Sequence, residues 1–195
     1  MLLKHLLPLL SVLLAAASVS AQAPATVHLP AGPEHKASAV HRFLFGRNWR
    51  AEWTTAIDAP VVALDTIYGG LVPYQRSGGG ESRSLRLRSR SGKEYVLRSV
   101  NKTRSNLLPA LLRRSAYGSL VQDGVSMSHP YAALALPGML DAARIPHAAP
   151  RLVYLPRQAA LDSFNDAYAG DLYLLEERPT GDWSDAAHLG GYRQY

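Results

Sequence analysis

Hydrophobic and polar positions alternate most strictly in the middle of the chain. Apolar and polar side chains take turns over residues 84–88, and a second strand-like run covers residues 94–100. Ser91 and Gly92 lie between the two runs, and a pair of this kind is typical of a hairpin turn. The pattern therefore predicts a β-hairpin with one face toward a core and the other toward solvent.

The remaining segments combine helical spacing with further β-type runs. Helices are predicted over residues 33–45, 106–120, 129–145 and 159–168, and strands over residues 60–68, 152–155 and 172–175. Pro137 and Gly138 are expected to kink or break the third helix, because proline lacks an amide hydrogen. Trp49 and Trp53, four residues apart, are expected to pack in the core. This order of elements predicts an α+β fold: an antiparallel sheet with a central β-hairpin and flanking helices.

The start of the chain has the parts of a secretory signal peptide. Lys4 supplies positive charge, and residues 6–17 form an apolar run too short to cross a bilayer. Small residues then precede a cleavage site after Ala21. We expect a signal peptide over residues 1–21, a flexible leader over 22–34 and a single α+β domain over 35–195. Because residues 190–195 close no recognisable element, the domain is expected to be a fragment of a larger protein.

Composition adds one prediction, the cellular compartment of the protein. The chain has 195 residues, no cysteine and a formal net charge of +6, and 47% of its residues are hydrophobic. This apolar share is typical of a globular protein rather than a disordered one. An exported domain without disulfides fits the Gram-negative periplasm. We therefore expect an exported protein that is periplasmic or associated with the outer membrane.

Positive charge is concentrated between residues 76 and 114. This segment contains eleven lysine and arginine residues and two glutamates. Such a stripe attracts phosphate, anionic lipid headgroups or nucleic acid, and export argues against nucleic acid as a partner. The alternative, a strand face that is simply kept soluble by charge, stays open.

A glycine-rich turn precedes the basic hairpin. Gly78, Gly79 and Gly80 lie between two strands and are followed closely by Ser82 and Arg83. Glycines let backbone amides approach an anion, which a hydroxyl and a guanidinium group would help to hold. The turn is not a Walker loop, because the G-x-x-x-x-G-K-[ST] pattern is absent. A glycine-rich hairpin tip without a ligand is the alternative.

Other catalytic patterns are missing from the sequence. The seven histidines are scattered, and neither H-E-x-x-H nor G-x-S-x-G occurs. Asp162 and Asp166 are interpreted as solvated carboxylates beside core aromatic residues. Glu176 and Glu177 are adjacent on a strand and point to opposite faces, so they are no acid/base pair. We expect no metal site and no hydrolase activity.

Three segments carry a resemblance to known proteins. They are GGGESRSLRL at residues 78–87, GKEYVLRSVNK at 92–102 and LLEERP at 174–179. They resemble an exported segment of large outer-membrane-associated proteins of Gram-negative bacteria, whose longer chains often end in a surface-antigen-type β-barrel. Their order also resembles the N-terminal lobe of atypical kinases of the HipA-like and CotH-like kinds. That likeness implies that the glycines cover nucleotide phosphates, that Arg98 or Lys102 replaces the phosphate-binding lysine, and that Glu176 and Glu177 form a hinge.

The sequence departs from the kinase pattern in ways that matter for activity. Arginine stands where lysine is expected, residues 130–140 offer no glutamate to pair with it, and neither a catalytic aspartate with a downstream asparagine nor a D-F-G metal ligand follows Trp183. We therefore expect no catalysis by this chain alone and no bound cofactor, with a nucleotide as one candidate ligand.

Two functional hypotheses follow. The first is a periplasmic or envelope domain, kinase-N-lobe-like, whose basic glycine-rich hairpin binds an anionic group. The second is a docking module that attaches an outer-membrane-associated protein to another protein or to a membrane. The expected partners are an anionic ligand or membrane surface, and a C-terminal lobe or outer-membrane barrel of the full-length protein.

Overall fold

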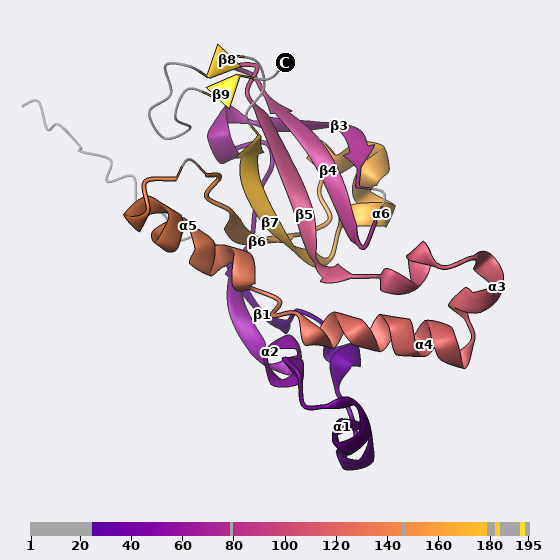
Figure 1. Cartoon of the computed structure of the whole chain (residues 1–195). Coiled ribbons are helices and arrows are strands. Elements are labelled where there is room, and N and C mark those ends of the chain that lie inside the picture. Colours follow the sequence, from indigo (N-terminus) through magenta and orange to yellow (C-terminus); the bar gives the residue numbers. More distant parts are fainter. Residues whose placement is uncertain (1–24, 79, 146, 179–181, 184–191, 194–195) are drawn as a thin grey trace, which may run out of the picture.

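The computed structural model describes residues 25–78, 80–145, 147–178, 182–183 and 192–193 (Figure 1). The predicted signal peptide over residues 1–21 and Gly79 lie outside the described residues. The strands are β1 (Thr26–Pro30), β2 (Ala56–Pro60), β3 (Leu71–Ser77), β4 (Ser82–Ser89), β5 (Glu94–Lys102), β6 (Arg151–Leu155), β7 (Asp171–Arg178), β8 (Asp182–Trp183) and β9 (Tyr192–Arg193). The α-helices are α1 (Ala39–Phe45), α2 (Arg50–Thr54), α3 (Ala110–Arg113), α4 (Ala116–Asp123), α5 (Ala132–Ala142) and α6 (Asn165–Tyr168). The 3₁₀ turns are η1 (Pro33–His35), η2 (Ile67–Gly69), η3 (Arg104–Leu107), η4 (Gly124–Met127) and η5 (Ala159–Phe164).

A five-stranded sheet organises the molecule. Its order is β3-β4-β5-β7-β6, and every neighbouring pair is antiparallel. The turn between β4 and β5 contains Gly92, whose φ of 85° suits a residue without a side chain. The predicted hairpin and the prediction of mixed α and β structure with antiparallel strands are therefore confirmed.

The main core lies on one face of this sheet. Leu85 lies opposite Leu97, and Leu97 lies opposite Leu175, and all three are almost fully buried. Leu161 in η5 and Tyr168 in α6 pack against this face. The alternation in β4 explains the arrangement, because every second side chain points to the same side.

A second, smaller core lies around Trp53 of α2. Trp53 is completely buried, and its indole Nε1 donates to the Ser128 carbonyl oxygen at 2.8 Å. Val100 and Leu172 contribute to this core from β5 and β7, and Val125 contributes from η4. This core therefore joins the helical segments to the sheet.

The predicted flexible leader is wrong over residues 26–30, which form strand β1. Val27 and Leu29 are partly buried against the second core, while Thr26 and His28 face outward. β1 pairs with β2 from Thr26 opposite Pro60 to Pro30 opposite Ala56. Its partner lies some thirty residues ahead, so the strand is stabilised by a contact that local composition does not reveal.

The strand predicted over residues 60–68 is also wrong. β2 ends at Pro60, and beyond it only Val61 continues extended pairing, through a hydrogen bond from its amide to the Ala25 carbonyl oxygen and an isolated bridge with Tyr154. Leu64 is held by a side chain, since its amide donates to Gln158 Oε1 at 2.8 Å. Tyr68 has a φ of 52°, which a strand does not allow.

The helical predictions are correct in place but too long. Residues 33–45 divide into η1 and α1, and Ser38 caps α1 by accepting from the His41 amide at 3.1 Å. Residues 106–120 divide among η3, α3 and α4. α5 continues through Pro137, so the expected break does not occur there. Trp49 is 45% exposed and is no core residue, in contrast to Trp53.

Candidate functional site

The glycine-rich turn joins β3 to β4, as predicted. Gly78 has a φ of 83°, and a Cβ placed on it would lie 2.8 Å from the Ser82 carbonyl oxygen. Position 78 therefore requires glycine for backbone reasons. Gly80 has open space around it, and Gly79 lies outside the described residues. The turn has a structural explanation that does not involve a ligand.

Arg83 is engaged at the start of β4. Its guanidinium donates to the Ala167 carbonyl oxygen and to the Asp171 carboxylate, and its amide donates to Ser99 Oγ at 3.0 Å. These contacts join the start of β4 to the segment between α6 and β7. An anion at the glycine turn would have to compete with Asp171 for this guanidinium.

Arg98 and the two predicted hinge residues are paired as well. Arg98 Nε donates to Glu176 Oε1 at 2.7 Å, and Lys93 Nζ donates to Glu177 Oε1 at 3.0 Å. Glu176 lies opposite Val96, and Glu177 lies opposite Tyr95, so the two carboxylates point to opposite faces as predicted. Lys102 lies opposite Ser82 at the far end of β5, four residues beyond Arg98.

The basic face of the hairpin is a network of compensated charges. Arg88 and Arg178 both donate to Glu94, at 3.0 and 2.8 Å. Burial raises the pKa of Glu94, but hydrogen bonds from these two arginines and Tyr74 hold it below its usual value. Arg88 also lies over the Tyr74 ring, 4.7 Å from its centroid. Much of the positive charge expected to bind an anion is therefore balanced within the sheet.

Two cavities lie elsewhere, and neither is lined by any of the nine predicted site residues. One is polar, with a volume of about 310 Å³, and lies between η1 and α4. The other is mainly apolar, with a volume of about 840 Å³, and lies beside β6.

The largest unexpected feature is the helical end, defined here as residues 36–49 and 102–122, which hold α1, η3, α3 and all of α4 except its last residue, Asp123. Figure 1 shows these helices at the end of the molecule away from β8 and β9. Phe43 in α1 is 87% exposed and Leu111 in α3 is 89% exposed. Further exposed apolar side chains of the helical end are Val40, Leu44, Phe45, Trp49, Leu107, Leu112, Tyr117 and Leu120. Apolar side chains of this size normally lie in a core, so their exposure here is a feature that packing within the described residues does not explain.

The helical end is also basic. It contains seven lysine and arginine residues and no aspartate or glutamate. Lys36, Arg47 and Arg114 are exposed, and none of them has an ion-pair partner among the described residues. Sequence reasoning missed this surface because the apolar residues of a predicted helix, such as that over residues 33–45, do not reveal whether they are buried. The lack of acidic residues over the two segments was the available signal.

A buried ion pair attaches the helical end to the second core. Arg50 of α2 donates from both terminal nitrogens to the Asp123 carboxylate at the end of α4, at 2.8 and 2.6 Å. His41 Nε2 of α1 lies 3.1 Å from the same carboxylate. The hydrogen bond from Arg50 holds the pKa of Asp123 below its usual range, with His41 acting in the same direction. This clamp fixes α1 and α4 relative to α2.

The described residues offer little for metal chemistry or membrane spanning. No group of three or more histidine, aspartate or glutamate side chains in this part of the chain is placed to hold a metal ion. Among the same residues, no helix has the length and apolar character needed to cross a membrane. Comparison with protein-family models, with curated proteins and with solved structures found no match for this chain.

Proposed function

We propose that the chain is a membrane-docking domain that binds an anionic bilayer surface through the helical end. One observation carries the proposal: Phe43 and Leu111 are almost fully exposed within two segments that contain no carboxylate and seven cations, of which Arg104 alone has a carboxylate partner among the described residues. Exposed apolar side chains beside lysine and arginine are typical of helices that lie in a membrane interface.

The energies fit surface attachment rather than insertion. Full burial of one phenylalanine or leucine side chain contributes about 1.5–3 kcal/mol. Each lysine or arginine close to an anionic bilayer contributes about 1 kcal/mol more. Phe43 and Leu111 together with Lys36, Arg47 and Arg114 therefore supply enough free energy for reversible binding.

The helical end fits this role better than the basic hairpin. The hairpin arginines Arg83, Arg88 and Arg98 already form ion pairs with carboxylates. A lipid phosphate would have to displace those carboxylates. At the helical end the exposed cations have no such competitor among the described residues, and apolar side chains lie next to them in sequence.

Vesicle co-sedimentation tests the proposal. We expect the protein to bind vesicles of phosphatidylcholine and phosphatidylglycerol at low salt, and to bind much more weakly to pure phosphatidylcholine or at high salt. The double variant Phe43→Ser/Leu111→Ser should lose at least about tenfold in affinity, equivalent to about 1.4 kcal/mol. Val72→Ser on β3, where the side chain is 63% exposed, is the matched control.

Three results would overturn membrane docking. They are equal binding to neutral and anionic vesicles, an equal loss in the Val72→Ser control, and no vesicle binding at low salt. A complex between protein chains that the Phe43→Ser/Leu111→Ser variant abolishes, without any vesicle binding, would identify a protein surface as the partner instead.

The kinase-N-lobe-like reading is our second proposal, in which the hairpin binds an anionic group such as a nucleotide. It is favoured by one observation: β7, with Glu176 and Glu177, pairs with β5, which carries Arg98 and pairs with β4 beside the glycine turn. Titration with a nucleotide tests it. Binding that Arg98→Ala abolishes supports this proposal, and no binding by the unmodified protein removes it.

A further inference from the structure

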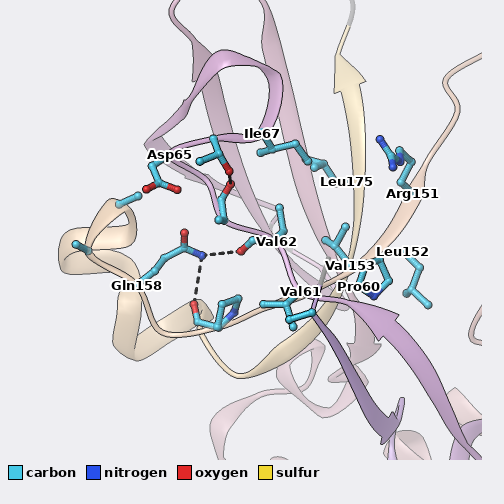
Figure 2. Close-up of a pocket in the computed structure, with 16 residues that line it drawn as sticks. Pro60, Val61, Val62, Asp65, Ile67, Arg151, Leu152, Val153, Gln158 and Leu175 are labelled. Carbon is cyan, nitrogen blue, oxygen red and sulfur yellow. Dashed lines mark hydrogen bonds between the residues drawn. The ribbon is translucent and has the colours of Figure 1, made fainter. Parts of the chain in front are cut away.

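The mainly apolar cavity beside β6 has the features of a small-molecule site. It lies between residues 60–67, β6 and the segment that leads into η5, and its volume is about 840 Å³ (Figure 2). Val62, Val153 and Leu175 form walls that are themselves almost fully buried. Ile67 and Leu152, both partly buried, add to the apolar lining. This volume falls in the range of cavities that hold small ligands.

The cavity is built by specific contacts rather than by loose packing. The Val62 amide donates to the Tyr154 carbonyl oxygen at 2.9 Å, which holds residues 60–67 against the edge of β6. Gln158 Nε2 donates to the Val62 carbonyl oxygen at 3.1 Å, and Gln158 Oε1 accepts from the Leu64 amide at 2.8 Å. Both polar atoms of Gln158 are therefore used to hold the wall. The remaining lining offers a ligand mainly apolar surface.

Two charged side chains lie at different sides of this cavity. Figure 2 shows Arg151 beside Leu152 and Leu175, and it shows Asp65 on the side of Gln158. Arg151 is exposed and is the sole cation among the described residues that line the cavity. Among the described residues, its guanidinium makes one hydrogen bond, from Nη1 to the Tyr68 hydroxyl at 3.4 Å, which is long for such a bond. The guanidinium therefore keeps capacity for an anionic partner.

We propose that this cavity binds a single-chain amphiphile with an anionic headgroup. The hydrocarbon chain lies among Val62, Ile67, Val153 and Leu175, and the headgroup accepts hydrogen bonds from Arg151. The Asp65 carboxylate repels an anionic headgroup from the side of the cavity near Gln158, so the headgroup is oriented toward Arg151. The proposal uses residues outside the helical end, so it does not rest on membrane docking.

Binding of dodecanoate below its micelle concentration tests the site. Titration calorimetry on the whole protein should give 1:1 binding that strengthens with chain length by about fourfold per methylene from octanoate to dodecanoate. Dodecanol, which has the same chain and no charge, should bind at least about tenfold more weakly. Lysophosphatidylglycerol with a 12-carbon chain distinguishes a lipid source from a free fatty acid. Binding of either anionic amphiphile supports the site, and binding of neither overturns it.

Two variants address the two parts of the cavity separately. Arg151→Gln should weaken dodecanoate about tenfold and leave dodecanol unchanged. Ala160→Leu, which narrows the apolar part, should weaken both ligands, and its fold is checked by thermal melting. Arg157→Gln is the matched control, because Arg157 is exposed near the cavity but pairs with Asp166 outside it. Dodecanoate binding that neither cavity variant changes, or that lacks the chain-length dependence, would refute the proposal whatever the stability of Ala160→Leu.

Discussion

Removing the carboxylate of Asp123 tests how the helical end is held to the rest of the molecule. The Arg50 side chain is 5% exposed, whereas that of Asp123 is 19% exposed. In Asp123→Asn the buried guanidinium keeps its charge and loses its bidentate partner. Its other acceptors, the carbonyl oxygens of His35 and Gly46, both lie 3.4 Å away and cannot replace a carboxylate.

The expected cost follows from this burial. Breaking a buried ion pair by removing one partner costs about 3–5 kcal/mol. We expect about 3 kcal/mol for Asp123→Asn, because water reaches about a fifth of the Asp123 side chain. For a chain of this length, that loss lowers the melting temperature by about 6–12 °C. The double variant Arg50→Met/Asp123→Leu should recover most of the loss, since it leaves no unpaired charge in the second core.

Urea unfolding followed by circular dichroism measures these differences, with the slope of the transition as a check on two-state behaviour. Asp58→Asn is the control, because the His28–Asp58 pair is 67% and 75% exposed. We expect the control to change the free energy of unfolding by less than about 0.5 kcal/mol. A loss under about 1 kcal/mol for Asp123→Asn, or a double variant less stable than the single one, would refute the clamp.

Two further predictions concern stability. Burial lowers the pKa of His35 below 6.5, so the folded state holds fewer protons than the unfolded state just below that pH. The free energy of unfolding should therefore fall as pH decreases from about 7 through 6.5, and His35→Gln should flatten this slope in urea titrations. Gly78→Ala should destabilise by about 1–3 kcal/mol, because φ is positive and the Cβ meets a backbone oxygen. Gly80→Ala, where space is open, should cost less than about 1 kcal/mol, and equal losses would contradict this explanation.

The sheet could be predicted where one strand carries its own pattern. The alternation in β4 and the turn at Gly92 are local signals, and both correctly gave the central hairpin. β1 could not be found in this way, because its stability comes from pairing with β2 and from packing on the second core. The run over residues 60–68 has strand composition, but Gln158 holds it in a turn from almost a hundred residues away. Local sequence does not contain such contacts.

Charge compensation at the candidate site could not be predicted from local sequence either. Residues 76–114 contain eleven cations and only two glutamates, so along the sequence most of the positive charge has no opposing charge nearby. The fold brings Asp171, Glu176 and Glu177 from a distant strand to Arg83, Arg98 and Lys93. Strand pairing therefore neutralises charges that seem unopposed along the chain.

The helical end follows the opposite course, and this contrast is the physical reason for placing the docking surface there. Its two segments contain no carboxylate; of the neighbouring carboxylates, Asp123 is engaged by Arg50 and His41, and Glu81 pairs with Arg104. Folding brings a basic partner to that carboxylate but brings no acid to Lys36, Arg47 or Arg114 within the described residues. We propose that charge which folding leaves uncompensated, next to apolar side chains that folding leaves exposed, binds an external partner that is both anionic and apolar. A bilayer surface meets both requirements at once.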